Sequence, residues 1–198
     1  MIALKIRILS ALVSVVSATT ALAVETLPSR PTEQQTVQMN LPRLSGSDFN
    51  DFYSDEANYR NVYRSVMSWF GSTSNGCVAF ASTALRMMGV NVPQNGVWNG
   101  ERLSLLTKPF SQYLENKLGW DRITDPKDLE PGDLVFTVDE PKAPGYPAHV
   151  FMHSGYADDA GTISLAVDNQ GFTHTRALAG DIKKDYSAFA YALRWPAQ

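Results

Sequence analysis

The chain has 198 residues, of which 44% are hydrophobic, and a formal net charge of −3. This length suits one domain with a fair-sized core, and since no basic stretch is concentrated we expect no nucleic-acid partner. The single cysteine excludes an internal disulfide, and one cysteine with three scattered histidines lacks the ligand spacing of a metal site. We expect a monomer that uses no metal or cofactor.

The first 23 residues predict a secretory signal peptide. Lys5 and Arg7 precede an apolar run over residues 8–16, and Ala21-Leu22-Ala23 supplies a small-x-small cleavage site. The run is too short for a permanent membrane span, and an N-terminal membrane anchor is the alternative. We expect an exported protein, periplasmic or secreted, with no membrane contact after the signal is removed.

Residues 24–47 contain three prolines and show no hydrophobic periodicity, so we expect an extended leader or linker. The compact domain is predicted to span residues 48–198. Its first helix is expected between an N-cap at Ser54 and a stop at Gly71, because apolar and aromatic residues recur at helical spacing over residues 59–70. This stripe predicts core packing; the alternative is a tyrosine hydroxyl that points at an active site.

A second helix is expected from Cys77 to Met88, and a third from Pro109 to Leu118. Residues 139–147, with three prolines, predict a loop, and residues 158–161 a tight hairpin. Helices followed by hairpin-linked strands predict an α+β fold with an antiparallel sheet. The expected strands are Leu134–Val138, His149–Tyr156, Thr162–Asn169, Phe172–Leu178 and Phe189–Arg194.

The only cysteine stands where a predicted loop meets a predicted helix. The loop Gly71–Gly76 ends directly before Cys77, which places this residue at a helix N-terminus. Unpaired backbone N–H groups and the helix dipole favour a thiolate there and could also bind an oxyanion. Cys77 is therefore our candidate nucleophile, and a small, buried, inert side chain is the alternative.

A thiol nucleophile needs a base, and the base needs a group that orients it. We favour His149 over His153 as the base, because His149 begins a strand after a proline-rich loop and lies at the rim of the sheet. His174, in a late strand with polar neighbours, is expected to be a solvated surface residue.

Strand phase suggests the orienting group. In the strand at residues 162–169, Val167 and Asn169 share the apolar face, and Asp168 points to the other side unless a bulge intervenes. The helices should cover the apolar face, and Cys77 belongs to a helix. We therefore expect Asn169 to orient His149 in a Cys-His-Asn triad; Asp168 as the third residue, or simple turn chemistry at residues 168–171, are the alternatives.

Three motifs occur in a familiar order: Cys77 at a helix start, Pro131-Gly132-Asp133-Leu134-Val135-Phe136, and Ala148-His149-Val150. Their order resembles the papain-like peptidoglycan hydrolases of the NlpC and CHAP types. The resemblance implies a cysteine amidase or endopeptidase with His149 as its base, acting on the stem peptides of peptidoglycan.

Two positions depart from the CHAP pattern: Gly76 replaces the glutamine before the cysteine, and Val167 replaces a glutamate near the third site. They motivate the second hypothesis, a catalytically weak or inactive cell-wall-binding or regulatory module on the same fold. The bond cut, the NlpC or CHAP subfamily, the oxyanion-hole side chain and whether the target is the cell's own or a foreign wall stay open.

Overall fold

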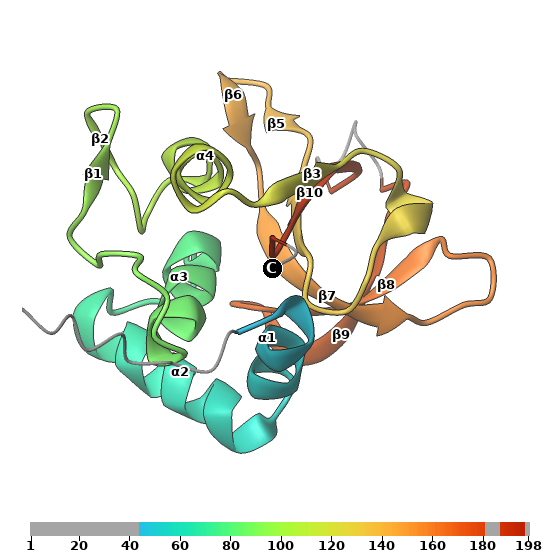
Figure 1. The fold of residues 1–198 in the computed structure, drawn as a ribbon, viewed down its shortest axis with the longest axis horizontal. Helices are drawn as coiled ribbons and strands as arrows, with labels where there is room; N and C mark the ends of the chain where they lie inside the picture. Colours follow the sequence, from blue (N-terminus) through green and yellow to red (C-terminus); the bar gives the residue numbers. More distant parts are fainter. Residues whose placement is uncertain (1–43, 181–186, 197–198) are drawn as a thin grey trace, which may run out of the picture. The chain divides into compact units, whose positions relative to one another are not determined.

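The computed structural model describes residues 44–180 and 187–196, so the predicted signal peptide and almost all of the predicted linker lie outside the described residues. A six-stranded sheet dominates this part of the chain, and all its neighbouring strands are antiparallel, in the order β3-β10-β4-β7-β8-β9. The predicted α+β fold with an antiparallel sheet is confirmed (Figure 1). The strands are β3 (Asp121–Ile123), β4 (Leu134–Thr137), β7 (Val150–Tyr156), β8 (Ile163–Asp168), β9 (Gly171–Ala177) and β10 (Phe189–Arg194).

Four α-helices accompany the sheet: α1 (Gly46–Tyr53), α2 (Glu56–Trp69), α3 (Cys77–Met87) and α4 (Thr107–Leu118). Three of them match predicted helices to within about two residues, because their apolar periodicity is strong. The N-cap of α2 is Asp55 rather than Ser54, and its carboxylate accepts the backbone N–H of Asn58. A short 3-10 helix, η1 (Pro126–Asp128), precedes β4.

The first helix was not predicted, and the expected domain start at residue 48 falls inside it. Ser45 and Asp48 form a capping box, in which each side chain accepts the other residue's backbone N–H. The helix is short, and it buries only Phe49 and Tyr53. Two apolar residues over eight positions make a weak periodic signal, so the capping box was the available indication.

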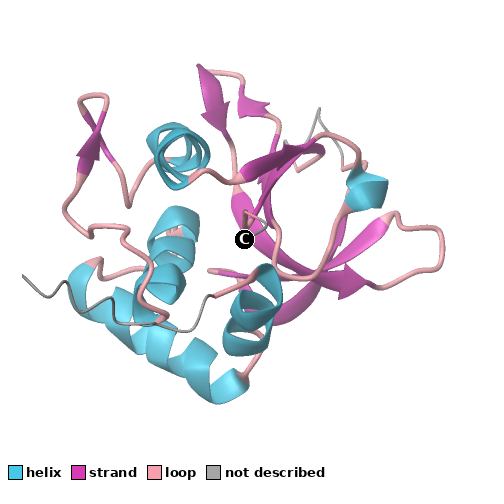
Figure 2. Cartoon of the chain, in the orientation of Figure 1, coloured by secondary structure: helices cyan, strands magenta, loops and turns pink. Residues whose placement is uncertain are grey.

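Two small hairpins were also not predicted. The expected loop at residues 139–147 contains β5 (Asp139–Glu140) and β6 (Ala143–Pro147), and a second hairpin joins β1 (Val97–Trp98) to β2 (Glu101–Arg102). Three of these strands have only two residues and carry no alternating pattern, and β6 contains two prolines and a glycine, which are typical of a loop. Figure 2 shows both hairpins as short strands at the margin of the helices and the main sheet.

The two faces of the sheet pack into different clusters. On one face, Val150, Met152 and Val167 join a large core with residues of all four helices. On the other, Phe151 and Ala166 belong to a smaller cluster formed mostly by the sheet itself. Consecutive residues of β7 therefore enter opposite clusters, as the period of two in a strand requires.

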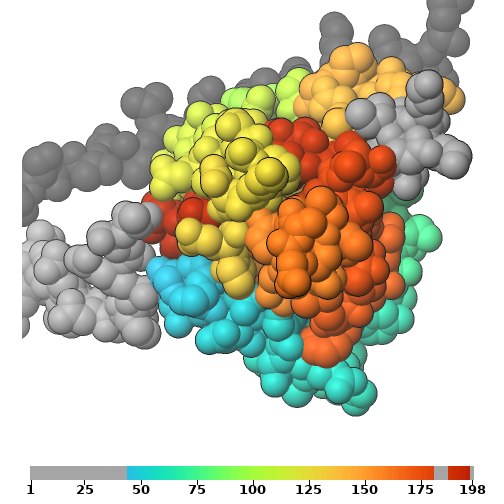
Figure 3. Space-filling model, turned by 90° about the vertical axis from the view of Figure 1, so that its right-hand side faces the viewer, coloured from blue at the N-terminus to red at the C-terminus, as the bar shows by residue number. Residues whose placement is uncertain are grey.

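The Pro131-Gly132-Asp133 turn, which precedes β4, packs closely against α1. Gly132 adopts φ +101°, and a Cβ at this position would collide with the backbone oxygen of Gly46 in α1. Only glycine satisfies both requirements. In Figure 3 the α1 segment, in blue, lies directly against the yellow segment that contains this turn. Among the described residues, no helix is long and apolar enough to cross a membrane.

Candidate functional site

Cys77 is the first residue of α3, as predicted, and only 8% of its surface is exposed. Its helix starts after Gly76, and the first turn carries neither a capping side chain nor an acidic residue. The backbone N–H groups of a first turn have no partner within the helix. The nucleophile candidate therefore lies at an electropositive helix end that no side chain neutralises.

The His149 imidazole interacts with a carboxylate and with a thiol. His149 directly precedes β7, and its Nε2 is 2.7 Å from Oδ2 of Asp168, while the Cys77 thiol interacts with the same ring. Burial lowers the pKa of His149, but interactions with Asp168 and Cys77 outweigh this and raise it overall. Because an ionised carboxylate only accepts, Nε2 carries the proton, and Nδ1 of the neutral ring is an acceptor.

The Asp168 side chain, at the end of β8, is 1% exposed and has partners on both oxygens. Oδ1 accepts the backbone N–H of Gln170 at 2.7 Å, and Oδ2 faces His149. Burial raises the pKa of Asp168, but hydrogen bonds with His149 and His174 and the charges of His149 and Arg176 bring it far below its usual range. The group that orients the histidine is thus a carboxylate that stays ionised.

This arrangement corrects the expectation for Asn169. The strand phase itself was right, since Val167 faces the helices and Asp168 faces the opposite side. The error was to place the imidazole on the helix-covered face. Because Met152 pairs with Val167, Asp168 continues the sheet next to Phe151, whose phase His149 shares.

Asn169 has another role in the site. Its Nδ2 donates to the backbone oxygen of Thr73 at 2.8 Å, and the same oxygen accepts the N–H of Gly76 at 3.1 Å. Asn169 therefore ties the turn that delivers Cys77 to the end of β8. Its own Oδ1 is buried and has no hydrogen-bond partner among the described residues.

Two residues of β9 join the site, and sequence reasoning missed both. Arg176 donates to Asp168 Oδ2 from Nε at 3.2 Å and from a terminal nitrogen at 3.1 Å. His174, expected to be solvated, is 28% exposed and places Nε2 3.5 Å from the same oxygen. Both residues belong to an alternating polar strand, and only their two-residue spacing on one face could have suggested a shared target.

Tyr53 contributes a buried hydroxyl that interacts electrostatically with Asp168 and Cys77. Its side chain is 1% exposed, and the hydroxyl has no hydrogen-bond partner within the described residues. Burial raises the pKa of Tyr53 well above its usual value, and the negative charges of Asp168, Tyr59 and Cys77 add to the effect. One interpretation of the aromatic stripe of α2 was a tyrosine hydroxyl that points at the active site. This is true only in part: the hydroxyl of Tyr59 donates to the backbone oxygen of Asp168.

His153, the base candidate that we did not favour, is buried. It lies on the face of β7 that packs into the smaller cluster, away from the thiol. Its Nδ1 is 2.7 Å from the Ser164 hydroxyl, which itself donates to the backbone oxygen of Leu165, so Nδ1 carries the proton. Nε2 is buried and has no hydrogen-bond partner in the part of the chain that the structure describes, and burial lowers the pKa of His153 to about 4.

We predict that His153 makes the protein less stable as the pH falls below about 6.5, the value in an unfolded chain. Below that pH the His153 ring is protonated in the unfolded chain, whereas in the folded protein it takes up the proton only near its pKa of about 4. This difference lowers the free energy of unfolding by about 3 kcal/mol at most. Urea unfolding at pH 7 and pH 5 should show a smaller loss of stability in His153→Gln than in the unchanged protein. Equal losses in both proteins would contradict this.

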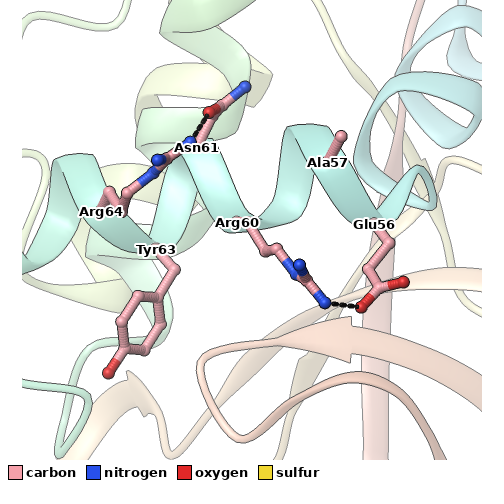
Figure 4. Close-up of a pocket in the computed structure, with 6 residues that line it drawn as sticks. All are labelled: Glu56, Ala57, Arg60, Asn61, Tyr63 and Arg64. Atoms are coloured by element: carbon pink, nitrogen blue, oxygen red, sulfur yellow. Dashed lines mark hydrogen bonds and ion pairs between the residues drawn. The ribbon is translucent and has the colours of Figure 1, made fainter.

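Three surface hollows in the described part of the chain do not include Cys77, His149 or Asp168. One of them, of about 640 Å³, lies along the outer face of α2, where Arg60 pairs with Glu56 and Arg64 with Asn61 (Figure 4). Within residues 44–180 and 187–196, no group of three or more His, Cys, Asp and Glu side chains is arranged to hold a metal ion.

No protein-family model, no curated protein and no solved structure matches this chain.

Proposed function

We propose that this protein is an exported cysteine hydrolase that cleaves an amide bond in the peptide part of peptidoglycan, through a Cys77-His149-Asp168 triad. The observation that carries the proposal is the imidazole of His149, which bonds the Asp168 carboxylate through Nε2 and interacts with the Cys77 thiol. A nucleophile, a base and an orienting group thus come together at one ring.

The reaction uses the proton positions derived above. Nδ1 of His149 takes the thiol proton while Sγ of Cys77 attacks the amide carbon, and the carbonyl oxygen becomes an oxyanion. Nδ1 then returns the proton to the amine as the C–N bond breaks, which leaves a thioester. Water attacks the thioester and gives a proton to Nδ1; the C–S bond breaks, the thiol regains that proton, and the products are an amine and a carboxylic acid.

We assign two donors to the oxyanion. The first is the backbone N–H of Cys77, in a first turn without a side-chain cap. The second is the Tyr53 hydroxyl, which has no hydrogen-bond partner among the described residues and interacts electrostatically with Cys77. Tyr53 would replace the glutamine side chain that Gly76 lacks.

The substrate class rests on the ordered motifs around Cys77, residues 131–136 and His149, which resemble papain-like NlpC and CHAP hydrolases. The antiparallel α+β fold, with the cysteine on a helix and the histidine at the start of a strand, is compatible with that architecture. The apolar and small-residue pattern of residues 1–23 supports export to the compartment where peptidoglycan is found.

A binding or regulatory module is the second candidate, and one observation favours it. With 8% of Cys77 exposed, a substrate carbonyl reaches the thiol only along a narrow approach. A module that keeps this fold without turnover would tolerate such burial.

Purified sacculi separate the two candidates. We expect the unchanged protein to release soluble fragments whose new amine and carboxyl ends, identified by mass spectrometry, name the cleaved bond. Cys77→Ala is the matched inactive control: it should release no fragments but should still sediment with sacculi. If neither protein releases fragments and both sediment with sacculi, the binding module is the better description.

A further inference from the structure

One carboxylate oxygen is shared by the base and by a cation. Oδ2 of Asp168 faces Nε2 of His149 at 2.7 Å, and Arg176 donates to it from Nε at 3.2 Å and from a terminal nitrogen at 3.1 Å. That terminal nitrogen also lies 3.0 Å from Nε2 of His149. Three N–H donors, one from His149 and two from Arg176, thus meet at a single acceptor.

The contact between Arg176 and His149 is not a hydrogen bond. Nε2 carries a proton that it directs to Asp168, and a guanidinium has no acceptor. Two N–H donors therefore lie side by side, each directed at the same oxygen. Protonation of Nδ1 would place a second positive charge against a guanidinium that is always charged, which raises the free energy of the imidazolium.

Arg176 is held firmly in this position. Its terminal nitrogen also donates to the Gln170 side-chain oxygen at 2.8 Å, and its guanidinium carbon lies 5.4 Å from the centre of the Phe151 ring. Only 13% of the side chain is exposed, so solvent screens its charge weakly.

We propose that Arg176 is a positioning residue that clamps Asp168 against His149 and limits the charge of the imidazole, so that Nδ1 releases its proton readily to a leaving amine. A triad with a free carboxylate would hold the proton on the imidazole more tightly. The inference rests on the proposed function only in treating His149 as the acid and base; the clamp itself is a matter of geometry.

The other ionisable groups around the imidazole and the carboxylate do not supply this effect. Among the described residues, Arg176 is the one permanently charged cation in contact with Asp168. His174 also lies near this carboxylate, but a histidine carries a charge only when its ring is protonated. The groups on the neighbouring elements are Tyr53 of α1, Tyr59 of α2, Cys77 of α3 and His174 of β9.

The test is a pH titration of the His149 ring by NMR in the full chain with labelled histidine, which needs no turnover. Arg176→Met should move the midpoint of the His149 titration up by about one pH unit, because a nearby charge is removed from a weakly screened site. Arg176→Lys keeps the charge and should restore most of the original midpoint. Arg60→Met, which breaks an exposed pair with Glu56 on α2, is the matched control and should change nothing.

An unchanged or lowered midpoint in Arg176→Met, with the ring still bonded to Asp168, overturns the proposal. If Arg176→Met does not fold, Arg176→Gln decides, because it also removes the charge but keeps an N–H donor for Asp168. Its midpoint should likewise move up, and no shift overturns the proposal. A protein that shows these shifts and yet releases nothing from sacculi would refute the hydrolase and leave the clamp standing.

Discussion

Replacing His149 with alanine is expected to lower the rate of amide cleavage by about 10⁴-fold, at the upper end of what a general acid–base catalyst contributes. The imidazole bonds Asp168 through Nε2 and interacts with the Cys77 thiol. Its loss removes both the base for Cys77 and the acid for the leaving amine. The measurement is the initial rate of fragment release from sacculi, with folding checked by circular dichroism.

Matched variants at the other two histidines sharpen this test. His153→Gln should keep most of the rate, because His153 bonds Ser164 and is directed away from the thiol. His174→Gln should cost less than about 10-fold, since its ring is 3.5 Å from Asp168 and does not touch the thiol. Equal loss from His149→Ala and His153→Gln, with both proteins folded, would leave the base unidentified.

Thiol alkylation gives a second readout for His149. Iodoacetamide reacts with thiolates, and a neighbouring base that accepts a thiol proton speeds the reaction. His149→Ala should therefore slow alkylation of Cys77 at pH 7, even if the sacculus substrate proves to be the wrong one. Alkylation at the same rate in both proteins would show that His149 does not activate the thiol.

Replacing Asp168 with asparagine is the prediction with the second-largest effect. We expect a loss of about 10³- to 10⁴-fold in kcat, because an amide no longer selects the tautomer with the proton on Nε2 and does not balance the imidazolium. The change also leaves the Arg176 guanidinium without its carboxylate, so the free energy of unfolding should fall. Rates are compared after urea unfolding has established the folded fraction.

Asn169→Ala is the control that separates two adjacent residues. Asn169 does not bond the imidazole; it bonds the Thr73 oxygen in the turn before Cys77. Its loss should loosen that turn and cost about 10-fold in rate, without a change in how the rate depends on pH. A larger loss from Asn169→Ala than from Asp168→Asn would restore Asn169 as the orienting residue and refute the triad drawn here.

Local pattern was sufficient for most of the fold. Apolar spacing near 3.6 residues predicted α2, α3 and α4, and alternation with turn residues predicted β4 and β7 to β10. The same local reasoning placed Cys77 at a helix start and His149 at the start of a strand, because a glycine-rich loop and a proline-rich segment mark those boundaries. Such features depend on near neighbours in the chain, and a sequence displays them directly.

The partners of the imidazole depended on strands that are distant in sequence. The register of β7 against β8 pairs Met152 with Val167 and so brings Asp168 to the Phe151 side. The register of β8 against β9 then brings His174 and Arg176 to the same carboxylate.

The sequence by itself determined α2, α3 and α4, the long strands, the position of the thiol at a helix end and the position of the histidine at a strand end. The tertiary structure decided that Asp168 rather than Asn169 orients His149, and that Arg176 and Tyr53 join the site. The physical reason is that strand register depends on side-chain packing over a whole sheet. Because adjacent residues of a strand point to opposite faces, assigning His149 to the wrong face exchanges Asp168 for Asn169 as the orienting residue.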